Sequence, residues 1–392
     1  MPWQKTDPVL ERVKFIAALL NEPNATFAEL CARFGVSRMT GYRWKKRFEN
    51  EGPSGLEDRP SVARRQPNAT AVEVEDAIVE MRKRYSTWGP KKIRRRLSDT
   101  QPELGLPALS TIGAILRRRG MIAPRRRRVL VPPSTTGLST PEHPNALWTA
   151  DHKGDFKLEE GRCYPLTICD ARSRYVLKCE ALPSTRTQPS RLQFEHAFRE
   201  FGLPDRIRSD NGTPFASTAL GGLSRLSVWW VKLGIELERI RPGHPEENGA
   251  HERMHRTLKA EAVQTGINFA EQQRRFDEFR LYFNHIRPHE GIDMDVPAQR
   301  YETSWRPYPS VVSSPEYPGM KVRRVQSNGS MHWKGKLLRI GKIFAGEPVG
   351  LEEVDDARWL LHFGSVQLAG IDGRGDEITV VRDLEGFAPR TP

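Results

Sequence analysis

The sequence predicts a multidomain α/β protein with N-terminal all-α helix-turn-helix units, a central mixed α/β sheet core and a small C-terminal β-barrel. Three observations support this prediction. The chain has 392 residues, which is too long for one core of ordinary size. Helical periodicity ending in an Arg-rich helix occurs twice before residue 124, and strands alternate with helices from residue 145 onward. After residue 308, short strands are punctuated by Gly and Asp-Gly turns.

The composition indicates a polyanionic partner. Lys and Arg total 62 against 49 Asp and Glu, which gives a formal charge of +13. Guanidinium groups match phosphate oxygens, so this surplus favours nucleic acid over a merely soluble basic protein. The four cysteines lack the spacing of a zinc module or a disulfide framework. The sequence contains neither a signal-like core nor about 18 consecutive apolar residues, so we expect no membrane partner and a cytoplasmic, DNA-associated protein.

Residues 1–58 are predicted to form a helix-turn-helix DNA-binding domain. Thr26 and Glu29 have capping-box spacing, and Ser37 can cap a third helix. The alternative is a three-helix packing unit with a solvated charged face. DNA binding is favoured because basic charge gathers on the third helix. Its candidate DNA-binding residues are Arg38, Tyr42, Arg43 and Lys46.

A second helix-turn-helix-like domain is predicted at residues 71–123, after a linker at 59–70. It again ends in a basic helix, which carries Arg117 and Arg118 as candidate DNA contacts. A basic linker at 124–144 follows. Its Arg125 and Arg126 contact phosphates or act only as a charged spacer.

The catalytic core is predicted at residues 145–302 and the β-barrel at 308–392. Within the core, three carboxylates stand at the ends of expected elements. Asp151 ends the first strand, Asp210 follows a later strand, and Glu252 lies in the first turns of a helix. Three like charges brought together need cations or protons to neutralise them. Oxygen ligands without thiolates favour Mg²⁺ (or Mn²⁺), and two such ions could promote in-line attack on a phosphodiester.

The motifs around these carboxylates resemble a known family. They are Trp148-Thr149-Ala150-Asp151, Ser209-Asp210-Asn211-Gly212-x-x-Phe215, and Pro245-x-x-Asn248-Gly249-x-x-Glu252-Arg253-x-x-x-Thr257-Leu258-Lys259. Together they resemble the RNase H-like catalytic core of DDE transposases and retroviral-type integrases, and the tandem N-terminal units resemble those of bacterial insertion-sequence transposases. The resemblance implies DNA-end cleavage and strand transfer by a homo-oligomer that holds two DNA ends.

The third carboxylate has two candidates. A spacing of about 35 residues after Asp210, common in the family, would select Glu246. We prefer Glu252, which holds the motif place between Asn-Gly and Thr-Leu-Lys. This choice requires an insertion, for which Gly221-Gly222-Leu223-Ser224 is the expected place. Glu246 and Glu247 are then expected to cap the start of the following helix, where the helix dipole stabilises negative charge.

Several neighbours of the carboxylates are candidate supporting residues. Lys259 lies seven residues after Glu252, so both are expected on one helix face. We expect His255 to be a surface residue, although it could approach the site. Arg253, Arg256 and Lys259 are candidates for holding phosphates, against ordinary solvated charges. Asn211, Gly212 and Asn248 are expected to support the site by shaping its turns.

The sequence therefore favours a transposase that binds double-stranded DNA, both as terminal inverted repeats and as target. Two other functions stay open: a hydrolytic nuclease of the same fold, and a sequence-specific DNA-binding protein with an inactive core. Tandem helix-turn-helix units argue against the nuclease, and the intact carboxylate set argues against the inactive core.

Overall fold

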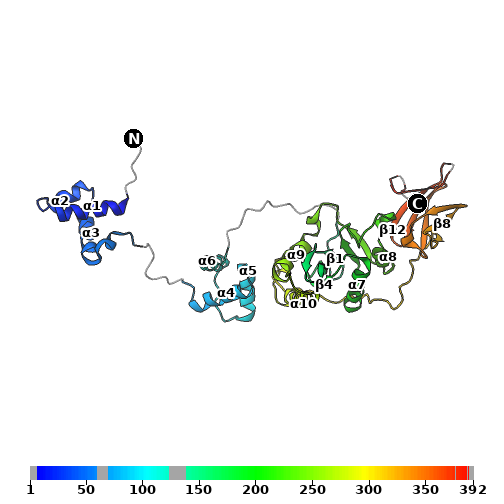
Figure 1. Ribbon diagram of the computed structural model, residues 1–392, viewed down its shortest axis with the longest axis horizontal. Helices are drawn as coiled ribbons and strands as arrows, with labels where there is room; N and C mark the ends of the chain where they lie inside the picture. The colour runs from blue at the N-terminus through cyan, green and yellow to red at the C-terminus, as the bar shows by residue number, and fades with distance from the viewer. Residues whose placement is uncertain (1–6, 60–68, 123–137, 376, 386, 388–392) are drawn as a thin grey trace. The chain divides into compact units, whose positions relative to one another are not determined.

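A computed structural model of the chain describes residues 7–59, 69–122, 138–375, 377–385 and 387. The chain forms two compact units, Met1–Thr70 and Ala71–Pro392. Figure 1 shows the order of the elements along the chain.

The first unit is a small helical domain. The predicted capping box is present, because Thr26 Oγ1 accepts from the Glu29 backbone N–H while the Glu29 carboxylate accepts from the Thr26 N–H. Ser37 likewise caps the third helix. Buried Phe15, Ile16, Leu30, Cys31, Trp44 and Leu56 form the core. The helices are α1 (Pro8–Asn21), α2 (Phe27–Arg33), α3 (Arg38–Glu51) and the 3-10 turn η1 (Gly52–Leu56).

The second unit begins with three further helices around their own core. Ile78, Trp88, Ile93, Ile112 and Leu116 are fully buried there. The cluster extends to Tyr282 and Ile286 of the central domain, so these helices dock on it. The helices are α4 (Val72–Arg84), α5 (Pro90–Thr100) and α6 (Leu109–Arg118).

Polar contacts fix this docking. Trp88 Nε1 donates to the hydroxyl of Tyr282 at 2.5 Å. Arg287 donates to the same hydroxyl at 3.0 Å, to Glu261 at 2.9 Å and to Thr87 at 3.2 Å. A fully buried indole that finds its hydrogen-bond partner on a different domain indicates a specific interface.

The central domain is a six-stranded mixed sheet with helices on both faces. Its path runs β2-β3-β1-β5-β6, and β4 also pairs with β3. Strands β1, β3 and β4 are antiparallel, whereas β5 is parallel to β1 and to β6. The strands are β1 (Leu147–His152), β2 (Phe156–Leu158), β3 (Gly161–Asp170), β4 (Val176–Leu182), β5 (Arg206–Ser209) and β6 (Glu236–Arg239).

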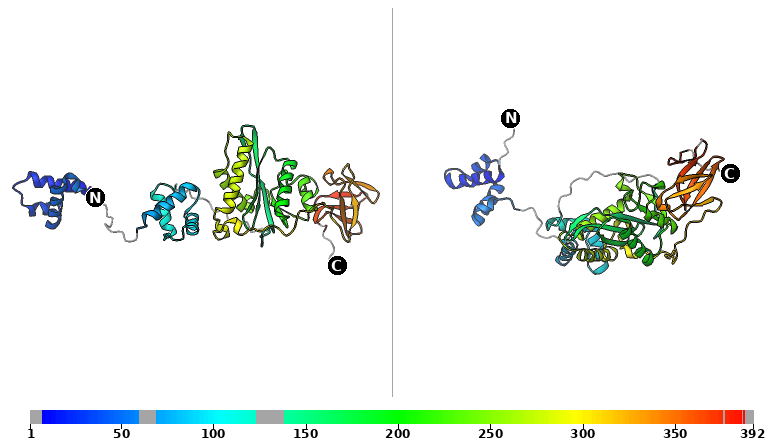
Figure 2. Two further views of the ribbon diagram at one scale, coloured as in Figure 1. Left: turned by 90° about the horizontal axis from the view of Figure 1, so that it is seen from below. Right: turned by 45° about the vertical axis from the view of Figure 1, so that its right-hand side comes forward.

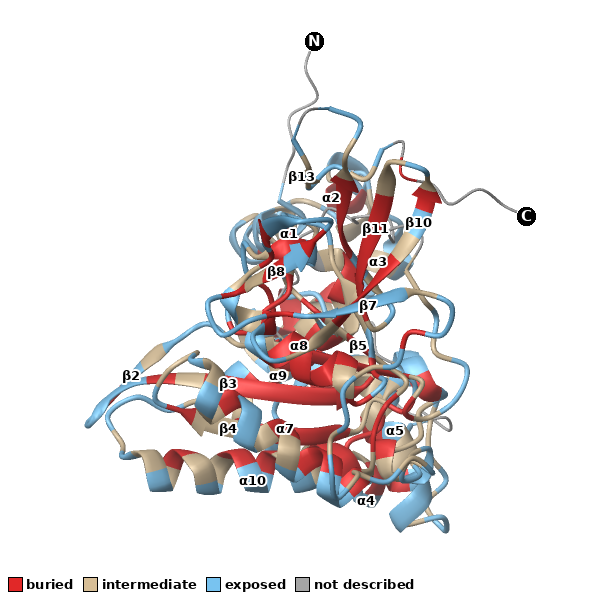
Figure 3. Cartoon of the chain, turned by 90° about the vertical axis from the view of Figure 1, so that its right-hand side faces the viewer, coloured by how far each residue is buried: buried red, intermediate tan, exposed pale blue. Residues whose placement is uncertain are grey.

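Two hydrophobic clusters cover the two faces of this sheet. On one face, Trp148 and Ile168 pack against Phe198 and Trp230 of α7 and α8. On the other, α9 and α10 pack against the alternate residues of β3 and β4. Figure 2 shows the helices on either side of the sheet, and Figure 3 shows β3 buried along most of its length. The helices are α7 (Thr187–Phe201), α8 (Arg225–Lys232), α9 (Gly249–Glu261) and α10 (Phe269–His285).

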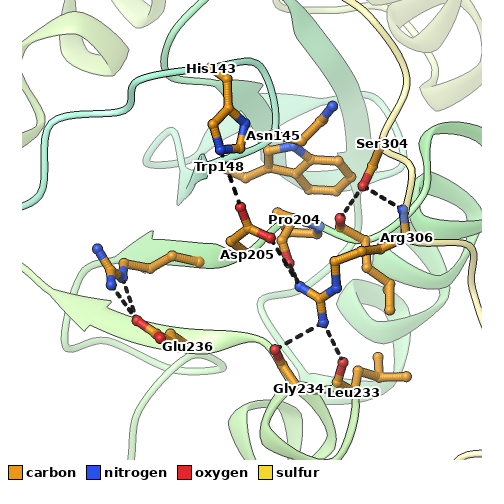
Figure 4. A network of polar contacts seen from close by, with 12 residues as sticks. His143, Asn145, Trp148, Pro204, Asp205, Leu233, Gly234, Glu236, Ser304 and Arg306 are labelled. Atoms are coloured by element: carbon orange, nitrogen blue, oxygen red, sulfur yellow. Dashed lines mark hydrogen bonds and ion pairs between the residues drawn. The ribbon is translucent and has the colours of Figure 1, made fainter.

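The segment that leaves the core is held against it by Arg306. Its guanidinium donates to the carbonyl oxygens of Pro204 at 2.7 Å and of Leu233 and Gly234 at 3.0 Å each. Ser304 Oγ adds a hydrogen bond to the Leu203 carbonyl (Figure 4). The first residues after the core are thus anchored where β5 begins and α8 ends.

The C-terminal domain contains a five-stranded antiparallel sheet and a separate hairpin. Among the described residues, the pairing path β13-β12-β11-β10-β7 ends at two unpaired edges, so the predicted closed β-barrel is not confirmed. The hairpin shares a buried cluster with the sheet and with Val228 and Val231 of α8. The sheet strands are β7 (Lys321–Arg324), β10 (Pro348–Asp355), β11 (Arg358–Phe363), β12 (Val366–Asp372) and β13 (Thr379–Val381), and the hairpin strands are β8 (Ser330–Trp333) and β9 (Lys336–Arg339).

Candidate active site

Two parallel strands bring Asp151 and Asp210 to the same edge of the central sheet. In the β1–β5 register Ala150 lies opposite Ser209, so the next residue on each strand is a carboxylate. Adjacent strands lie about 4.8 Å apart, which makes these two aspartates neighbours. The Gly212 backbone N–H donates to Asp210 Oδ1 at 3.1 Å and orients that carboxylate.

Glu252 joins Asp151 from the first turn of α9. Among the described residues, a group of potential metal-ligand atoms lying within 4.8 Å of one another belongs to Asp151, Glu252 and His255. Asp210 stands outside this tight group, although its charge acts on Asp151. Glu246 is elsewhere, in the 3-10 turn η3 (Pro245–Asn248), where it contacts His244 Nδ1 at 2.8 Å.

The environment at this edge of the sheet disfavours the ionised form of Asp151. Burial, followed by the charges of Asp210 and Glu252, raises the pKa of Asp151 from 3.8 to about 7. Lys153 offsets this only in part. A carboxyl group whose pKa is raised by burial and by neighbouring carboxylates is typical of a site that binds a cation.

Beneath the carboxylates lies a buried polar cluster of Thr149, Thr167, His251 and His255. His251 Nδ1 lies 2.7 Å from Thr149 Oγ1, and its Nε2 lies 2.7 Å from Thr167 Oγ1. His255 Nε2 lies 2.7 Å from the same Thr167 oxygen. Burial lowers the pKa of His251 to about 3 and lowers that of His255 further.

The expectation that His255 lies on the surface is therefore wrong. Its side chain is 0% exposed, and His251 is 2% exposed. The two histidines lie four residues apart, which places them on one face of α9. That spacing was the available signal, but only the partner strands show that this face points inward.

The supporting residues lie in the two loops beside the carboxylates. Asn211 is exposed, and its amide donates to the Ile240 carbonyl at 2.7 Å, which ties the Asp210 loop to the end of β6. Asn248 is buried at the start of α9. Glu247 is also buried and accepts from the Arg241 backbone N–H at 2.7 Å, so it closes the loop before the helix.

The cationic candidates are exposed wherever the structure describes them. Arg253, Arg256 and Lys259 lie on α9, the helix that also carries Glu252. Arg118 forms an ion pair with Glu75 inside its own helical domain. Arg125 and Arg126 fall outside the described residues. The exposed candidates on α3 and α6 are Arg38, Tyr42, Arg43, Lys46, Arg117 and Arg118.

Family models match almost every domain of the chain. An integrase core domain matches residues 141–245, and a second integrase core model matches residues 233–297. The C-terminal domain of IS481 family transposases matches residues 320–379. The chain therefore contains an integrase core domain and a C-terminal domain like that of IS481 family transposases. A helix-turn-helix domain matches residues 11–65 and a homeodomain-like domain matches residues 40–116.

Individual relatives resemble only part of the chain. It is 34% identical over 120 residues to the Gag-Pol polyprotein of baboon endogenous virus (strain M7), and 32% identical over 116 residues to the Pol polyprotein of feline endogenous virus ECE1. Each match covers 30% of this chain but only 6% and 10% of the respective relative.

Solved structures are similar at low sequence identity. The HTLV-2 integrase catalytic core domain in complex with magnesium has 15% identity and a TM-score of 0.33, covering 41% of this chain and 99% of that one. A simian T-cell lymphotropic virus intasome has 14% identity and a TM-score of 0.37, covering 76% and 100%. Within the described part of the chain, no helix is both long and apolar enough to cross a membrane.

Proposed function

We propose that this chain moves a bacterial insertion sequence by cutting DNA at terminal inverted repeats and joining the ends to target DNA. The observation that supports it most is the meeting of Asp151, Asp210 and Glu252 at one edge of an integrase core domain. The transposase and helix-turn-helix matches support a DNA substrate. Cytoplasmic location is part of the same proposal.

The donor set fits a divalent cation. Asp151 and Glu252 offer oxygens within 4.8 Å of each other, and burial together with the charges of Asp210 and Glu252 raises the pKa of Asp151. We propose Asp151, Asp210 and Glu252 as the residues that would hold Mg²⁺ or Mn²⁺, two ions per site. When bound, such ions supply Lewis-acid activation of the attacking oxygen and stabilise the leaving oxygen.

The protein side chains then have separate tasks. Asp151, Asp210 and Glu252 are the proposed catalytic residues. Arg253, Arg256 and Lys259 are positioned by α9 to hold phosphates beside them, because exposed cations on that helix can reach a bound backbone. Asn211 and Gly212 hold the loop that carries Asp210, and we propose Asn248, buried at the start of α9, as a further supporting residue.

The chemistry consists of two phosphoryl transfers. Water first attacks a phosphodiester at the element end, which breaks the P–O3′ bond and releases a 3′-hydroxyl. That hydroxyl then attacks a target phosphodiester, so one P–O bond forms while another breaks and no external energy source is needed. We propose that a homo-oligomer holds both ends during these steps.

The domain division is part of the proposal. Its boundaries are a helix-turn-helix domain at 1–58, a linker at 59–70, a second such domain at 71–123 and a basic linker at 124–144, followed by the RNase H-like core at 145–302 and the C-terminal domain at 308–392. For the last domain we propose a small barrel-like fold, in which the β8–β9 hairpin covers the five-stranded sheet.

The test is a joining assay with labelled DNA carrying the sequence that flanks the gene. Wild-type chain, Asp210→Asn and metal-free wild type are incubated with plasmid. We expect joined product only with the wild-type chain in the presence of the divalent ion, and none with Asp210→Asn or without metal. Hydrolysis without joining would instead favour a nuclease of the same fold, and binding without either reaction would favour a DNA-binding protein with an inactive core.

A further inference from the structure

The buried cluster under the carboxylates contains one nitrogen that the protein leaves without a hydrogen bond. His255 contacts Thr167 through Nε2, and its other ring nitrogen, Nδ1, has no hydrogen-bond partner in the described part of the chain. Nδ1 lies 3.5 Å from Asp151 Oδ2 and belongs to the group that includes Glu252. Buried polar atoms are nearly always satisfied, so this exception requires an explanation.

Counting hydrogen atoms shows what Nδ1 offers. The Thr167 hydroxyl has one proton, which it donates to the Asp151 carbonyl oxygen at 3.2 Å. Its oxygen must then accept from the Nε2–H of His251 and of His255, both at 2.7 Å. We assign the 2.7 Å contact between His251 Nδ1 and the Thr149 hydroxyl as donated by Thr149, whose alternative acceptor, the Cys169 carbonyl oxygen, lies farther away at 3.4 Å. Neutral His255 with its proton on Nε2 has a lone pair on Nδ1.

This lone pair is aimed at the carboxylates. The side chain is fully buried and is fixed by Thr167, so the ring cannot turn away without breaking a hydrogen bond. Metal-binding histidines usually donate their second N–H to a fixed acceptor, which sets the tautomer and orientation. Thr167 supplies such an acceptor here.

We propose that His255 Nδ1 is a direct ligand of the divalent ion held by Asp151 and Glu252, with Thr167 as its positioning residue. The proposal rests on the function proposed above and adds a nitrogen to its all-oxygen site. Imidazole suits transition metals, whereas Mg²⁺ prefers oxygen. The chain should therefore bind Mn²⁺ more tightly than Mg²⁺, and removal of the His255 imidazole should reduce the difference between the two affinities.

Pulsed electron paramagnetic resonance of the Mn²⁺-loaded full chain tests this proposal. A directly bound imidazole nitrogen modulates the Mn²⁺ spin echo, and labelling histidine with ¹⁵N changes that modulation in a known way. We expect the nitrogen signal in the wild type and its loss in His255→Asn. We also expect Mn²⁺ affinity to fall by about tenfold or more, since even the partners of ligands contribute about 10–100-fold. His196→Asn, a histidine on α7, is the matched control.

The outcomes separate the two proposals. Mn²⁺ binding that depends on Asp151 but shows no nitrogen signal in the wild type overturns the role of His255 and leaves the proposed function standing. If neither wild type nor ¹⁵N-labelled wild type binds Mn²⁺ in an Asp151-dependent way, both proposals fail. The ¹⁵N measurement needs only the wild type, so the absence of a nitrogen signal overturns the role of His255 even where His255→Asn does not fold.

Discussion

At the scale of single residues, burial and neighbouring negative charge act in the same direction on the Asp151 carboxyl group. Asp151 has a pKa of about 7 because it is buried beside Asp210 and Glu252. The folded chain therefore binds this proton more tightly than the unfolded chain, whose value is near 3.8. The resulting stabilisation is complete below about pH 3.8 and is lost as the pH rises through about 7.

We expect Asp151→Asn to stabilise the metal-free chain at about pH 8, because it removes a charge that folding disfavours. The gain is a few kcal/mol at most, at about 1.4 kcal/mol per pKa unit, and it should shrink toward pH 4. Thermal unfolding in a chelator at several pH values measures it. Glu246→Gln serves as the control, and an equal melting temperature for Asp151→Asn and wild type at pH 8 would contradict the prediction.

A second residue-scale prediction compares the two candidate glutamates. Glu252 lies with Asp151, whereas Glu246 contacts His244. Glu252→Gln should reduce DNA joining by more than about a hundredfold, given that even second-sphere changes at metal sites cost about 10–100-fold. Glu246→Gln should keep activity within a fewfold of wild type. Single-turnover rates with labelled ends distinguish them, and the reverse ranking would move the third ligand to Glu246.

At the scale of elements, local features could be predicted from the sequence, whereas the packing of helices against the sheet could not. The capping box of Thr26 and Glu29 is local, and it was predictable because its partners lie three residues apart. The strand ends at Asp151 and Asp210 were predictable from turn residues that follow them. The inward face of α9 was not predictable, because it depends on Thr149 and Thr167, which lie 102 and 84 residues before His251.

The docking of the second helical domain on α10 is another long-range contact. Trp88 is 0% exposed and donates to Tyr282. Trp88→Ala should destabilise the second unit by about 3 kcal/mol or more, as expected for a fully buried indole. Chemical unfolding measures the change. Trp305 is 83% exposed, so Trp305→Ala provides a matched loss of indole with little expected effect. Similar losses for both variants would contradict the prediction.

The exposed face of α3 gives a prediction about salt dependence. Lys46 is exposed on the helix proposed to contact DNA. Lys46→Ala should weaken DNA binding on all sequences and lower the slope of log affinity against log salt by about 1. Fluorescence anisotropy at several salt concentrations measures the slope. Lys14 on α1 already pairs with Glu11, so Lys14→Ala should change the slope less, and equal slopes for the two variants would argue against α3 as the DNA-binding helix.

At the scale of the whole chain, the order of domains was readable from the sequence, but their attachments were not. Alternating hydrophobicity predicted strands such as β11 and β12, and the structure has them. Pairing at the edges of the sheet depends on residues far apart in sequence, which is why closure into a barrel could not be decided from periodicity. The sharing of one hydrophobic cluster between α8 and the C-terminal sheet carries no local signal either.

A chain ending at residue 310 should therefore be poorly soluble. It would uncover Leu220, Leu223, Val228 and Val231, all buried in the shared cluster. Large exposed apolar patches promote association. Size-exclusion chromatography and binding of a hydrophobic dye measure the effect. Removal of residues 1–70, a separate compact unit, should leave the remainder monodisperse, and a well-behaved chain ending at 310 would contradict the prediction.

The same cluster limits how the C-terminal domain could be exchanged for that of a related protein. Val228 and Val231 are encoded within the core, yet they pack with the C-terminal sheet. In a chimaera that joins this core to the C-terminal domain of another protein near residue 308, Val228 and Val231 would pack against a surface that is not complementary to them. A functional exchange would have to replace the outer face of α8 together with the C-terminal domain. The boundary for such an exchange therefore lies inside the central domain and not at its end near residue 302.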